Sequence, residues 1–338
     1  MITLIVTSEK SGIDKYSQEI AQRIDVSKIE TRRYLSLKEG YQLARLIGKQ
    51  SDIVHLPNQD FARYAIFLKS PFIVTAHDLI RSCFSFSSEM LSERLWLTLD
   101  KHYVKRASHI IAVSQHTKHD LMEYLKLPEN RISVIYNGID HSIFKPYNIK
   151  VLDKPYILYV GSERPRKNLG RLLKAFAKLK GDFPELKLVK VGAVGRSEGY
   201  RRNVMRKLDS LGIIQEVIFV GPVSELDLAR YYSSASLLAY PSLYEGFGLP
   251  PLEAMACGCP VVTSNNSSFP EVVGEAGIMV DPYDTDALAQ AMKQVLTDDK
   301  LRDDMDGKGL EQAKKFSWEE TARKTQEVYN KVAEQYGE

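Results

Sequence analysis

One segment in the second half of the chain constrains the fold more than any other. Leu237–Tyr240 is a short apolar run that predicts a buried strand, and Pro260–Ser264 predicts the next strand. Between them, Pro250 or Pro251 can occupy the first position of a short helix. The order strand, loop, helix, strand is that of a βαβ crossover, which joins parallel strands. The segment therefore predicts a parallel sheet with helices packed on it.

The loop inside this segment has the features of a ligand site. Gly246 and Gly248 carry no side chains, so backbone N–H groups can approach a ligand closely there. The following helix directs the positive end of its dipole toward the loop. Two carboxylates flank the glycines, Glu245 before them and Glu253 in the first turn of the helix. Either acid alone is explained more simply as a solvated or dipole-complementing residue. The whole pattern suits a ligand with hydroxyl groups and negative charge, such as a sugar phosphate.

The stretch from Glu245 to Glu253 reads Glu-Gly-Phe-Gly-Leu-Pro-Pro-Leu-Glu, with Pro-Ser-Leu-Tyr before it. It resembles the donor-sugar loop of retaining glycosyltransferases of family 4, which have the two-Rossmann GT-B architecture. The resemblance implies that Glu245 is a catalytic-site residue that contacts the transferred hexose, and that Glu253 contacts the ribose hydroxyls. It also implies that Gly246 and the backbone amides from Phe247 to Leu249 hold the sugar.

A second ligand signal lies at the start of the C-terminal half. Tyr156–Val160 predicts a strand, and the loop after it carries Arg164, Arg166 and Lys167 just before a predicted helix. Three cations beside the free amides of a helix N-terminus form a diphosphate site, since Arg binds phosphate in forked geometry and Lys as a point charge. The alternative, a solvated run of charges, is weaker because of this placement.

The sequence of the same loop also resembles a motif of this family, with one difference. Family members commonly have Gly-Arg, four residues and then Lys; here Ser162 stands in place of that Arg, while Lys167 matches. The diphosphate arginine is therefore either Arg164 or Arg166. The variant Gly-Ser-x-x-Pro-Arg-Lys-Asn resembles a mannosyltransferase-like branch, which favours GDP-mannose as donor, with UDP-glucose or a related UDP-hexose close behind. By the same resemblance, backbone groups near Val223 contact the base.

The first half of the chain also alternates apolar strands with helices, which predicts a parallel, doubly wound sheet with ligands beyond the carboxyl ends of its strands. His77 directly follows the predicted strand Phe72–Ala76. A lone His there is more often a hydrogen-bonded loop residue than a catalyst. Family members have a His at this strand end that lines the donor pocket, so we assign His77 a role in positioning the sugar and no proton transfer. Gly12, after the strand Ile2–Thr7, is a weak phosphate signal that matches the family's glycine loop.

The chain length fits two domains. Its 338 residues suffice for two α/β domains with separate cores. Residues 147–155 are polar, irregular and bounded by prolines, which indicates a linker. The predicted domains span 1–146 and 155–316, and the resemblance implies that the first binds the acceptor and the second the nucleotide sugar. By resemblance, these are two Rossmann-like doubly wound domains facing across a cleft, with a helix over 317–338 packing back on the first.

The net charge and the cysteine content of the chain limit the ligands and binding partners that it can have. The net charge of +3 and isoelectric point near 8.5 fit phosphorylated ligands or loose contact with an anionic membrane. The basic residues between Arg94 and His119 suit a solvated helix face best; the alternative is a patch for anionic lipid, since many family members use lipid-linked acceptors. No nucleic-acid motif is present. Cys83, Cys257 and Cys259 form neither a disulfide framework nor a zinc pattern.

Together with these observations, the resemblance implies a retaining hexosyltransferase that moves a hexose, with mannose favoured, from a nucleotide-diphosphate sugar to a hydroxyl of a glycan or lipid-linked acceptor. Lys167 and an arginine would stabilise the leaving diphosphate, so no metal or other cofactor is expected. Without a signal peptide or a long apolar run in the sequence, the expected location is the cytoplasm, with peripheral contact at the inner face of the membrane as a further option. The alternatives are a nucleotide-sugar epimerase, a nicotinamide oxidoreductase and a non-catalytic sugar-nucleotide binding protein.

Overall fold

The computed structural model describes residues 1–7, 12–32, 35–48, 52–83, 91–195 and 198–336. They divide into two compact units, one formed by Met1–Gly138 with Ser317–Glu338 and one by Ile139–Phe316. The division falls earlier than the domain end placed at residue 146 in the sequence analysis. Residues just after Gly138 join the second unit because Phe144 packs on Tyr232, with ring centroids 6.4 Å apart.

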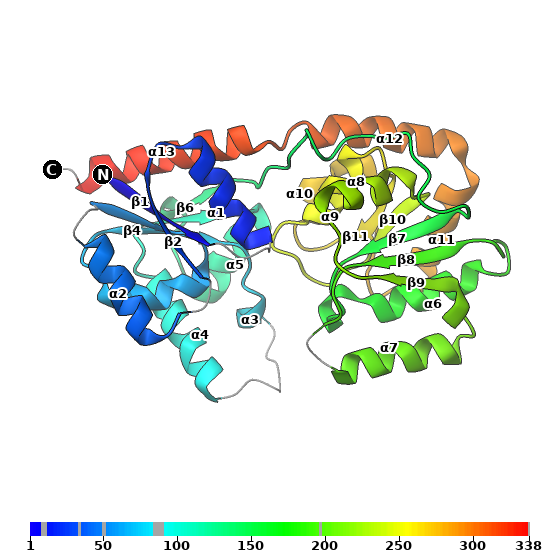
Figure 1. Ribbon diagram of the computed structural model, residues 1–338, viewed down its shortest axis with the longest axis horizontal. Coiled ribbons are helices and arrows are strands. Elements are labelled where there is room, and N and C mark those ends of the chain that lie inside the picture. The colour runs from blue at the N-terminus through cyan, green and yellow to red at the C-terminus, as the bar shows by residue number, and fades with distance from the viewer. Residues whose placement is uncertain (8–11, 33–34, 49–51, 84–90, 196–197, 337–338) are drawn as a thin grey trace. The chain divides into compact units, whose positions relative to one another are not determined.

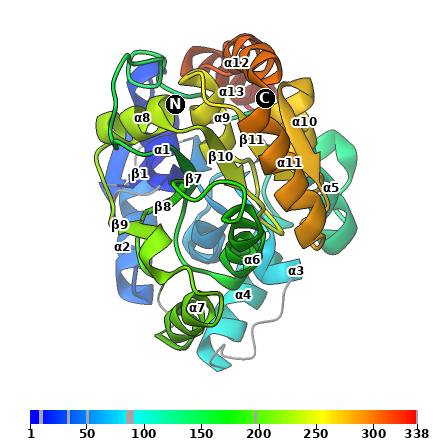
Figure 2. The same cartoon turned by 90° about the vertical axis from the view of Figure 1, so that its right-hand side faces the viewer.

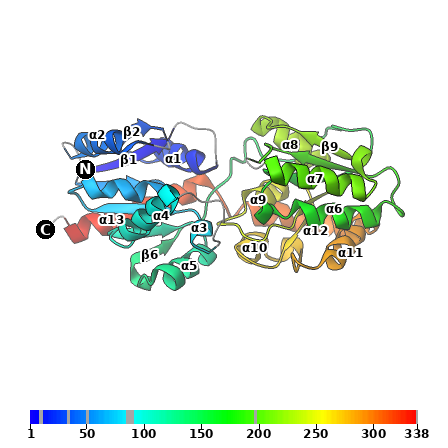
Figure 3. The same cartoon turned by 90° about the horizontal axis from the view of Figure 1, so that it is seen from below.

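The first unit is built on a six-stranded sheet in the order β2-β1-β3-β4-β5-β6, and its neighbouring strands run parallel. Strands β2 and β6 lie at its two edges (Figure 3). The central strands are buried along their length, as expected for a sheet covered on both faces. The strands are β1 (Ile2–Thr7), β2 (Ser27–Thr31), β3 (Ile53–Leu56), β4 (Phe72–Ala76), β5 (His109–Ala112) and β6 (Ile132–Val134).

Helices cover both faces of this sheet. One face packs against α2 (Leu37–Ile47), the 3₁₀ helix η1 (Gln59–Phe67), α4 (Leu91–Val104) and α5 (Gln115–Leu125). The other face packs against α1 (Gly12–Arg23) and α13 (Trp318–Tyr336), which lie side by side (Figure 1). The remaining helices of the unit are α3 (Ile80–Cys83) and η2 (Glu129–Arg131).

Helix α13 is held in the first unit by buried contacts. Trp318 is fully enclosed in the core, and the hydroxyl of Tyr329 lies 2.7 Å from Nδ1 of His55 on β3. The Thr321 hydroxyl donates to the carbonyl of Tyr136 at 2.8 Å. Gly138 has to be a glycine here, because a Cβ at this position would lie 2.1 Å from the backbone nitrogen of Trp318. The end of the chain thus completes the core of its beginning.

The second unit has its own six-stranded sheet in the order β12-β11-β10-β7-β8-β9, again with parallel neighbours. This is the Rossmann order, in which the direction of chain winding reverses between β7 and β10. In open parallel sheets, ligands bind beyond the carboxyl ends of the strands at that point. The strands are β7 (Tyr156–Val160), β8 (Lys187–Val191), β9 (Val217–Val220), β10 (Leu237–Tyr240), β11 (Val261–Ser264) and β12 (Gly277–Val280).

Helices again cover both faces of the second sheet. Helices α6, α7 and α11 share one apolar core with the strands, and Met305 of α12 reaches the same core. Helices α8, α9, α10 and α12 lie on the other side (Figures 1 and 2). Their bounds are α6 (Leu169–Leu179), α7 (Glu198–Ser210), α8 (Glu225–Ser234), α9 (Leu249–Ala256), α10 (Phe269–Val273), α11 (Thr285–Thr297) and α12 (Asp299–Ala313), with short 3₁₀ turns η3 (Pro165–Lys167), η4 (Ile214–Glu216) and η5 (Gly274–Ala276).

The structure confirms the predicted fold class of two doubly wound parallel sheets. The apolar runs predicted as strands correspond to strands, and β7 and β10 have the predicted bounds. Within the described residues, no helix combines the length and the apolar character needed to cross a membrane.

Candidate functional site

The winding reversal of the second sheet brings two loops together. Strand β7 pairs with β10 in parallel, so both carboxyl ends meet at one edge. The loop after β7 runs into η3, and the loop after β10 runs into α9. The backbone N–H of Leu243 donates to the carbonyl of Arg166 at 2.7 Å, which joins the two loops directly.

The carboxylate of Glu245 lies at the centre of this junction. Its Oε1 lies 2.6 Å from Nζ of Lys167 and accepts from the Tyr240 hydroxyl at 3.1 Å. The Ser242 hydroxyl donates to the same oxygen at 2.7 Å. Its Oε2 lies 3.0 Å from an Nη1 of Arg166. The side chain of Glu245 is only 11% exposed, so these contacts form in a largely water-free environment. We call these five residues the Glu245 cluster.

Burial and pairing act in opposite directions on this carboxyl group. Burial alone would raise the pKa of Glu245, but the charges of Lys167 and Arg166 lower it to about 2. Burial lowers the pKa of Lys167, and Glu245 opposes that change. Glu245 is therefore ionised at neutral pH and has no proton to give. A carboxylate of this kind suits the binding of ligand hydroxyls, and the cations beside it suit phosphate oxygens.

The start of α9 is formed by the glycine loop predicted from the sequence. Gly248 has φ +108° and precedes the first helical residue, Leu249. A side chain there would be strained, and its Cβ would lie 3.3 Å from the ring of Phe269. The Ser268 hydroxyl fixes the loop by donating to the carbonyl of Phe247 at 2.5 Å. The amides of Phe247–Leu249 thus lie at a helix N-terminus in a fixed conformation.

Glu253 lies further along α9 than the sequence predicted. The helix begins at Leu249, so Glu253 falls in its second turn instead of its first. Its Oε2 accepts from the hydroxyl of Tyr232 on α8 at 2.9 Å. Arg164 is exposed at the start of η3, and Val223 is half-buried between β9 and α8 at the same edge of the sheet.

His77 and Gly12 belong to the first unit, where each follows the carboxyl end of a strand. His77 is buried, and its Nε2 donates to the carbonyl of Pro57 at 2.9 Å. Its backbone N–H donates to the Gln59 side chain at 3.0 Å, and its ring meets the Tyr16 ring edge-on at 5.1 Å. These contacts hold the imidazole in one orientation. Gly12 opens helix α1.

Sequence reasoning missed two members of the Glu245 cluster, Tyr240 and Ser242. Both are fully buried, Tyr240 at the end of β10 and Ser242 in the loop after it. The available signal was a hydroxyl group at the end of an otherwise apolar strand, since a buried hydroxyl needs a partner.

Among the residues that the structure describes, no group of three or more His, Cys, Asp or Glu side chains could hold a metal ion. Cys257 and Cys259 are both buried and free. Burial raises the pKa of the Cys257 thiol to about 12. These two thiols are packing residues in this unit.

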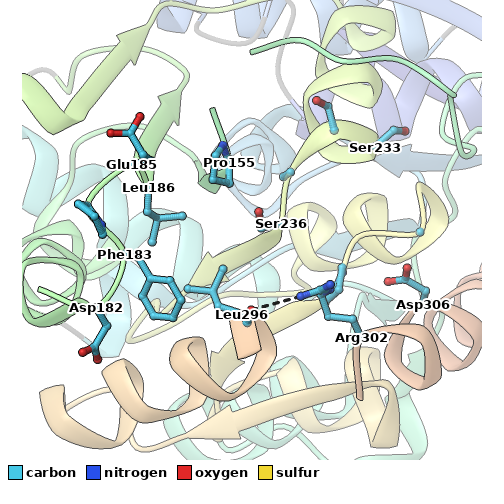
Figure 4. Close-up of a pocket in the computed structure, with 15 residues that line it drawn as sticks. Pro155, Asp182, Phe183, Glu185, Leu186, Ser233, Ser236, Leu296, Arg302 and Asp306 are labelled. Atoms are coloured by element: carbon cyan, nitrogen blue, oxygen red, sulfur yellow. Dashed lines mark hydrogen bonds between the residues drawn. The ribbon is translucent and has the colours of Figure 1, made fainter. Parts of the chain in front are cut away.

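A separate cavity of about 670 Å³ opens beside the amino ends of the strands of the second sheet, at the end opposite to the Glu245 cluster. Figure 4 shows Phe183, Leu186 and Leu296 around it, and Arg302 donates to the backbone carbonyl of Leu296 at 3.3 Å. None of the predicted site residues lines it. Because open parallel sheets bind ligands at the carboxyl ends, the Glu245 cluster and not this cavity is the candidate site.

Mannosyltransferases are among the known proteins that this chain resembles in sequence. The O-antigen chain mannosyltransferase B of Escherichia coli is 37% identical over 66% of this chain and 60% of that protein. The serotype-specific mannosyltransferase WbdA of Escherichia coli is 33% identical over 64% of this chain and 28% of that protein. The chain therefore spans less than two thirds of the length of each of these relatives. Among solved structures, HepE of Anabaena matches 97% of this chain and 99% of its own with a TM-score of 0.80 at 20% identity, a likeness of fold.

Two family models cover the chain almost end to end. "Glycosyltransferase Family 4" matches residues 4–143, and "Glycosyl transferases group 1" matches residues 142–312, just over half of the chain. The first match covers the sheet of the first unit, and the second covers β7 to α12 with the complete Glu245 cluster. The chain belongs to glycosyltransferase family 4, with a C-terminal domain of the glycosyl transferases group 1 and the GT-B type of fold.

Proposed function

We propose that this protein transfers a hexose, with mannose favoured, from a nucleotide-diphosphate sugar to a hydroxyl of a glycan or lipid-linked acceptor, with retention of anomeric configuration and without a metal ion. The observation that supports this most is the Glu245 cluster at the winding reversal of the second sheet. It combines two cations for a diphosphate, a carboxylate for sugar hydroxyls and the amides of a helix N-terminus.

In the proposed complex, the donor diphosphate binds Lys167 and Arg166. We favour Arg166 over Arg164 because it is half-buried and its guanidinium is held by the carbonyl of Tyr244 at 3.0 Å, whereas Arg164 is exposed. A cation fixed in a low-dielectric site stabilises a phosphate charge more strongly than a solvated one. The hexose then lies at Glu245 and the amides of Phe247–Leu249, with Glu253 at the ribose and backbone groups near Val223 at the base. Gly12 and His77 of the first unit are assigned to donor binding by the family resemblance alone.

The proposed mechanism of hexose transfer depends on the negative charge that develops on the leaving diphosphate. The bond between the anomeric carbon and the phosphate oxygen breaks, the acceptor oxygen attacks from the same face, and its proton passes to the departing phosphate oxygen. The leaving diphosphate gains negative charge, so Lys167 and Arg166 stabilise the transition state more than the ground state. Glu245 acts as a sugar ligand: three groups already lie at its Oε1, and a carboxylate with a pKa of about 2 is a weak base.

The relatives favour this reading over its alternatives. The two Escherichia coli relatives are named as mannosyltransferases, which supports mannose. HepE was solved with UDP and glucose, which keeps a UDP-hexose as the second candidate donor. An epimerase would convert the donor without an acceptor, and a binding protein would bind it without any turnover.

Calorimetry with GDP-mannose and UDP-glucose, in the presence of EDTA, tests the proposal. We expect one donor to bind and the variant Lys167→Met to lose at least about tenfold in affinity, since it lacks a charge-assisted contact. The matched control is Lys180→Met: Lys180 also pairs with a glutamate, the half-buried Glu216, at 2.7 Å, but beside the amino ends of the strands. Binding of neither donor, or binding that EDTA abolishes, would overturn the proposal. The anomeric configuration of the product, read by NMR, decides retention.

A further inference from the structure

Tyr240 occupies an unusual place in the second sheet. It is the last residue of β10, directly at the winding reversal, and it is completely buried. Its ring packs edge-on against Phe269 with centroids 5.8 Å apart, which fixes the direction of the side chain. The remainder of the strand, Leu237–Ala239, is apolar. A phenol hydroxyl at this point needs polar partners, because an unpaired buried hydroxyl is costly.

The partners of this hydroxyl are the two oppositely charged members of the Glu245 cluster. Nζ of Lys167 donates to the Tyr240 oxygen, and the Tyr240 hydroxyl donates to Oε1 of Glu245 at 3.1 Å. The direction of both bonds is fixed, because an ammonium group can only donate and a carboxylate can only accept. Burial raises the pKa of Tyr240 well above its usual value, so the hydroxyl keeps its proton. The phenol thus bridges the ammonium and the carboxylate.

We propose that Tyr240 is a positioning residue of the donor site: by bridging Lys167 and Glu245, its hydroxyl keeps the ammonium directed at the donor diphosphate and the carboxylate directed at the hexose. This inference rests on the function proposed above. Tyr240 touches neither diphosphate nor sugar in this scheme and acts only through its two partners.

The bridge matters most for Lys167, because burial disfavours its charged form. Glu245 opposes that effect, whereas Arg166 and Arg164 add to it from the same loop. From β7, the Tyr159 hydroxyl lies 3.4 Å from the carbonyl oxygen of Lys167 and not at its ammonium. Removal of the Tyr240 oxygen therefore takes away one of the acceptors of a buried ammonium. Lys167 would then lose its proton at a lower pH.

The variant Tyr240→Phe removes the bridge and keeps the ring that packs on Phe269. The same sheet offers a matched control, Tyr156→Phe. Tyr156 is also buried, but it begins β7 at the amino edge, where its hydroxyl donates to the carbonyl of Tyr231 at 2.7 Å. Both variants lose one buried hydroxyl of the same sheet, so a general packing effect would appear in both.

The first measurement is the affinity for GDP and UDP by calorimetry across neutral and alkaline pH. We expect Tyr240→Phe to bind about tenfold more weakly at alkaline pH and to begin losing affinity at a lower pH than the wild type, because a lost hydrogen bond to a charged group has about this effect. Tyr156→Phe should follow the wild-type curve. Identical curves for Tyr240→Phe and the wild type would overturn the inference.

A second measurement separates this inference from the proposed function. The rate of acetylation of Lys167 in the ligand-free protein, followed by mass spectrometry over pH, reports when the amine becomes neutral. The midpoint should lie at a lower pH in Tyr240→Phe than in the wild type or Tyr156→Phe, and an unchanged midpoint would overturn the inference. If the wild type binds no nucleoside diphosphate, the proposed function fails, while the acetylation curve still decides whether Tyr240 controls Lys167.

Discussion

Replacing Glu245 by Gln tests the electrostatics of the candidate site directly. In the native protein, the pKa of Glu245 lies at about 2, against an ordinary value of 4.5. The native pKa is the lower one, so ionised Glu245 stabilises the fold fully above pH 4.5, and this contribution is lost as the pH falls toward 2. The shift corresponds to about 3 kcal/mol of the free energy of unfolding of the second unit.

At neutral pH, Glu245→Gln leaves Lys167 and the half-buried Arg166 without their carboxylate, which costs about 3–5 kcal/mol. As the pH falls, the wild type loses its own advantage, so the difference between the two proteins should shrink by about 3 kcal/mol. Because Trp96 and Trp318 both lie in the first unit, tryptophan fluorescence follows that unit alone. Urea unfolding should therefore be followed by circular dichroism as well, and the second unit assigned by difference.

The matched control is Glu320→Gln on the surface of α13. Its pKa is also lowered to about 2, chiefly by its hydrogen bond to Arg323, but its side chain is exposed. Salt screens exposed pairs and leaves buried ones largely intact. High salt should thus remove the effect of Glu320→Gln and preserve that of Glu245→Gln. A constant difference at all pH values, or a Glu245 effect that vanishes in salt, would refute the description of Glu245 as a buried, paired carboxylate.

Two further predictions concern stability. Gly248→Ala should lower the free energy of unfolding by about 1–3 kcal/mol, because φ is +108° and the new Cβ meets Phe269. Gly307→Ala lies in an exposed and open part of α12 and should raise the free energy of unfolding by up to about 1 kcal/mol. Calorimetric melting of both variants checks this contrast. In the first unit, burial lowers the pKa of His55 to about 3. Between pH 6.5 and about 3, His55 is therefore protonated in the unfolded chain and neutral in the native protein. Stability should therefore fall by about 1.4 kcal/mol per pH unit from 6.5 to about 3, and His55→Gln should flatten that slope in urea titrations read by tryptophan fluorescence; an equal slope in both proteins would contradict the assignment.

Much of the fold was predictable because each buried strand has a local sequence signal. Tyr156–Val160 and Leu237–Tyr240 are apolar runs bounded by loop residues, and the structure gives them the predicted bounds. Strand β2 (Ser27–Thr31) was missed for the opposite reason. It lies at the sheet edge, its residues alternate between half-buried and exposed, and its sequence carries no apolar run.

The candidate site was predictable in its parts and not in its contacts. The motif around Glu245 and the cations at Arg166 and Lys167 could each be read as ligand sites. Their direct pairing depends on the strand order, which places β10 beside β7 although they are far apart in sequence. Local patterns do not encode that order. The contribution of Tyr240 was hidden for the same reason, since its partners come from both loops.

The pairing also explains why so costly an arrangement is present. Two cations and a carboxylate in a water-poor junction are weak evidence for stability, because well-packed apolar residues would serve as well or better. Lys167 and Arg166 both pair with the carboxylate of Glu245, so these three side chains together carry one more positive than negative charge. An anionic diphosphate would compensate that excess, and its loss on donor release would restore it. This charge balance is what we expect of the diphosphate site proposed above.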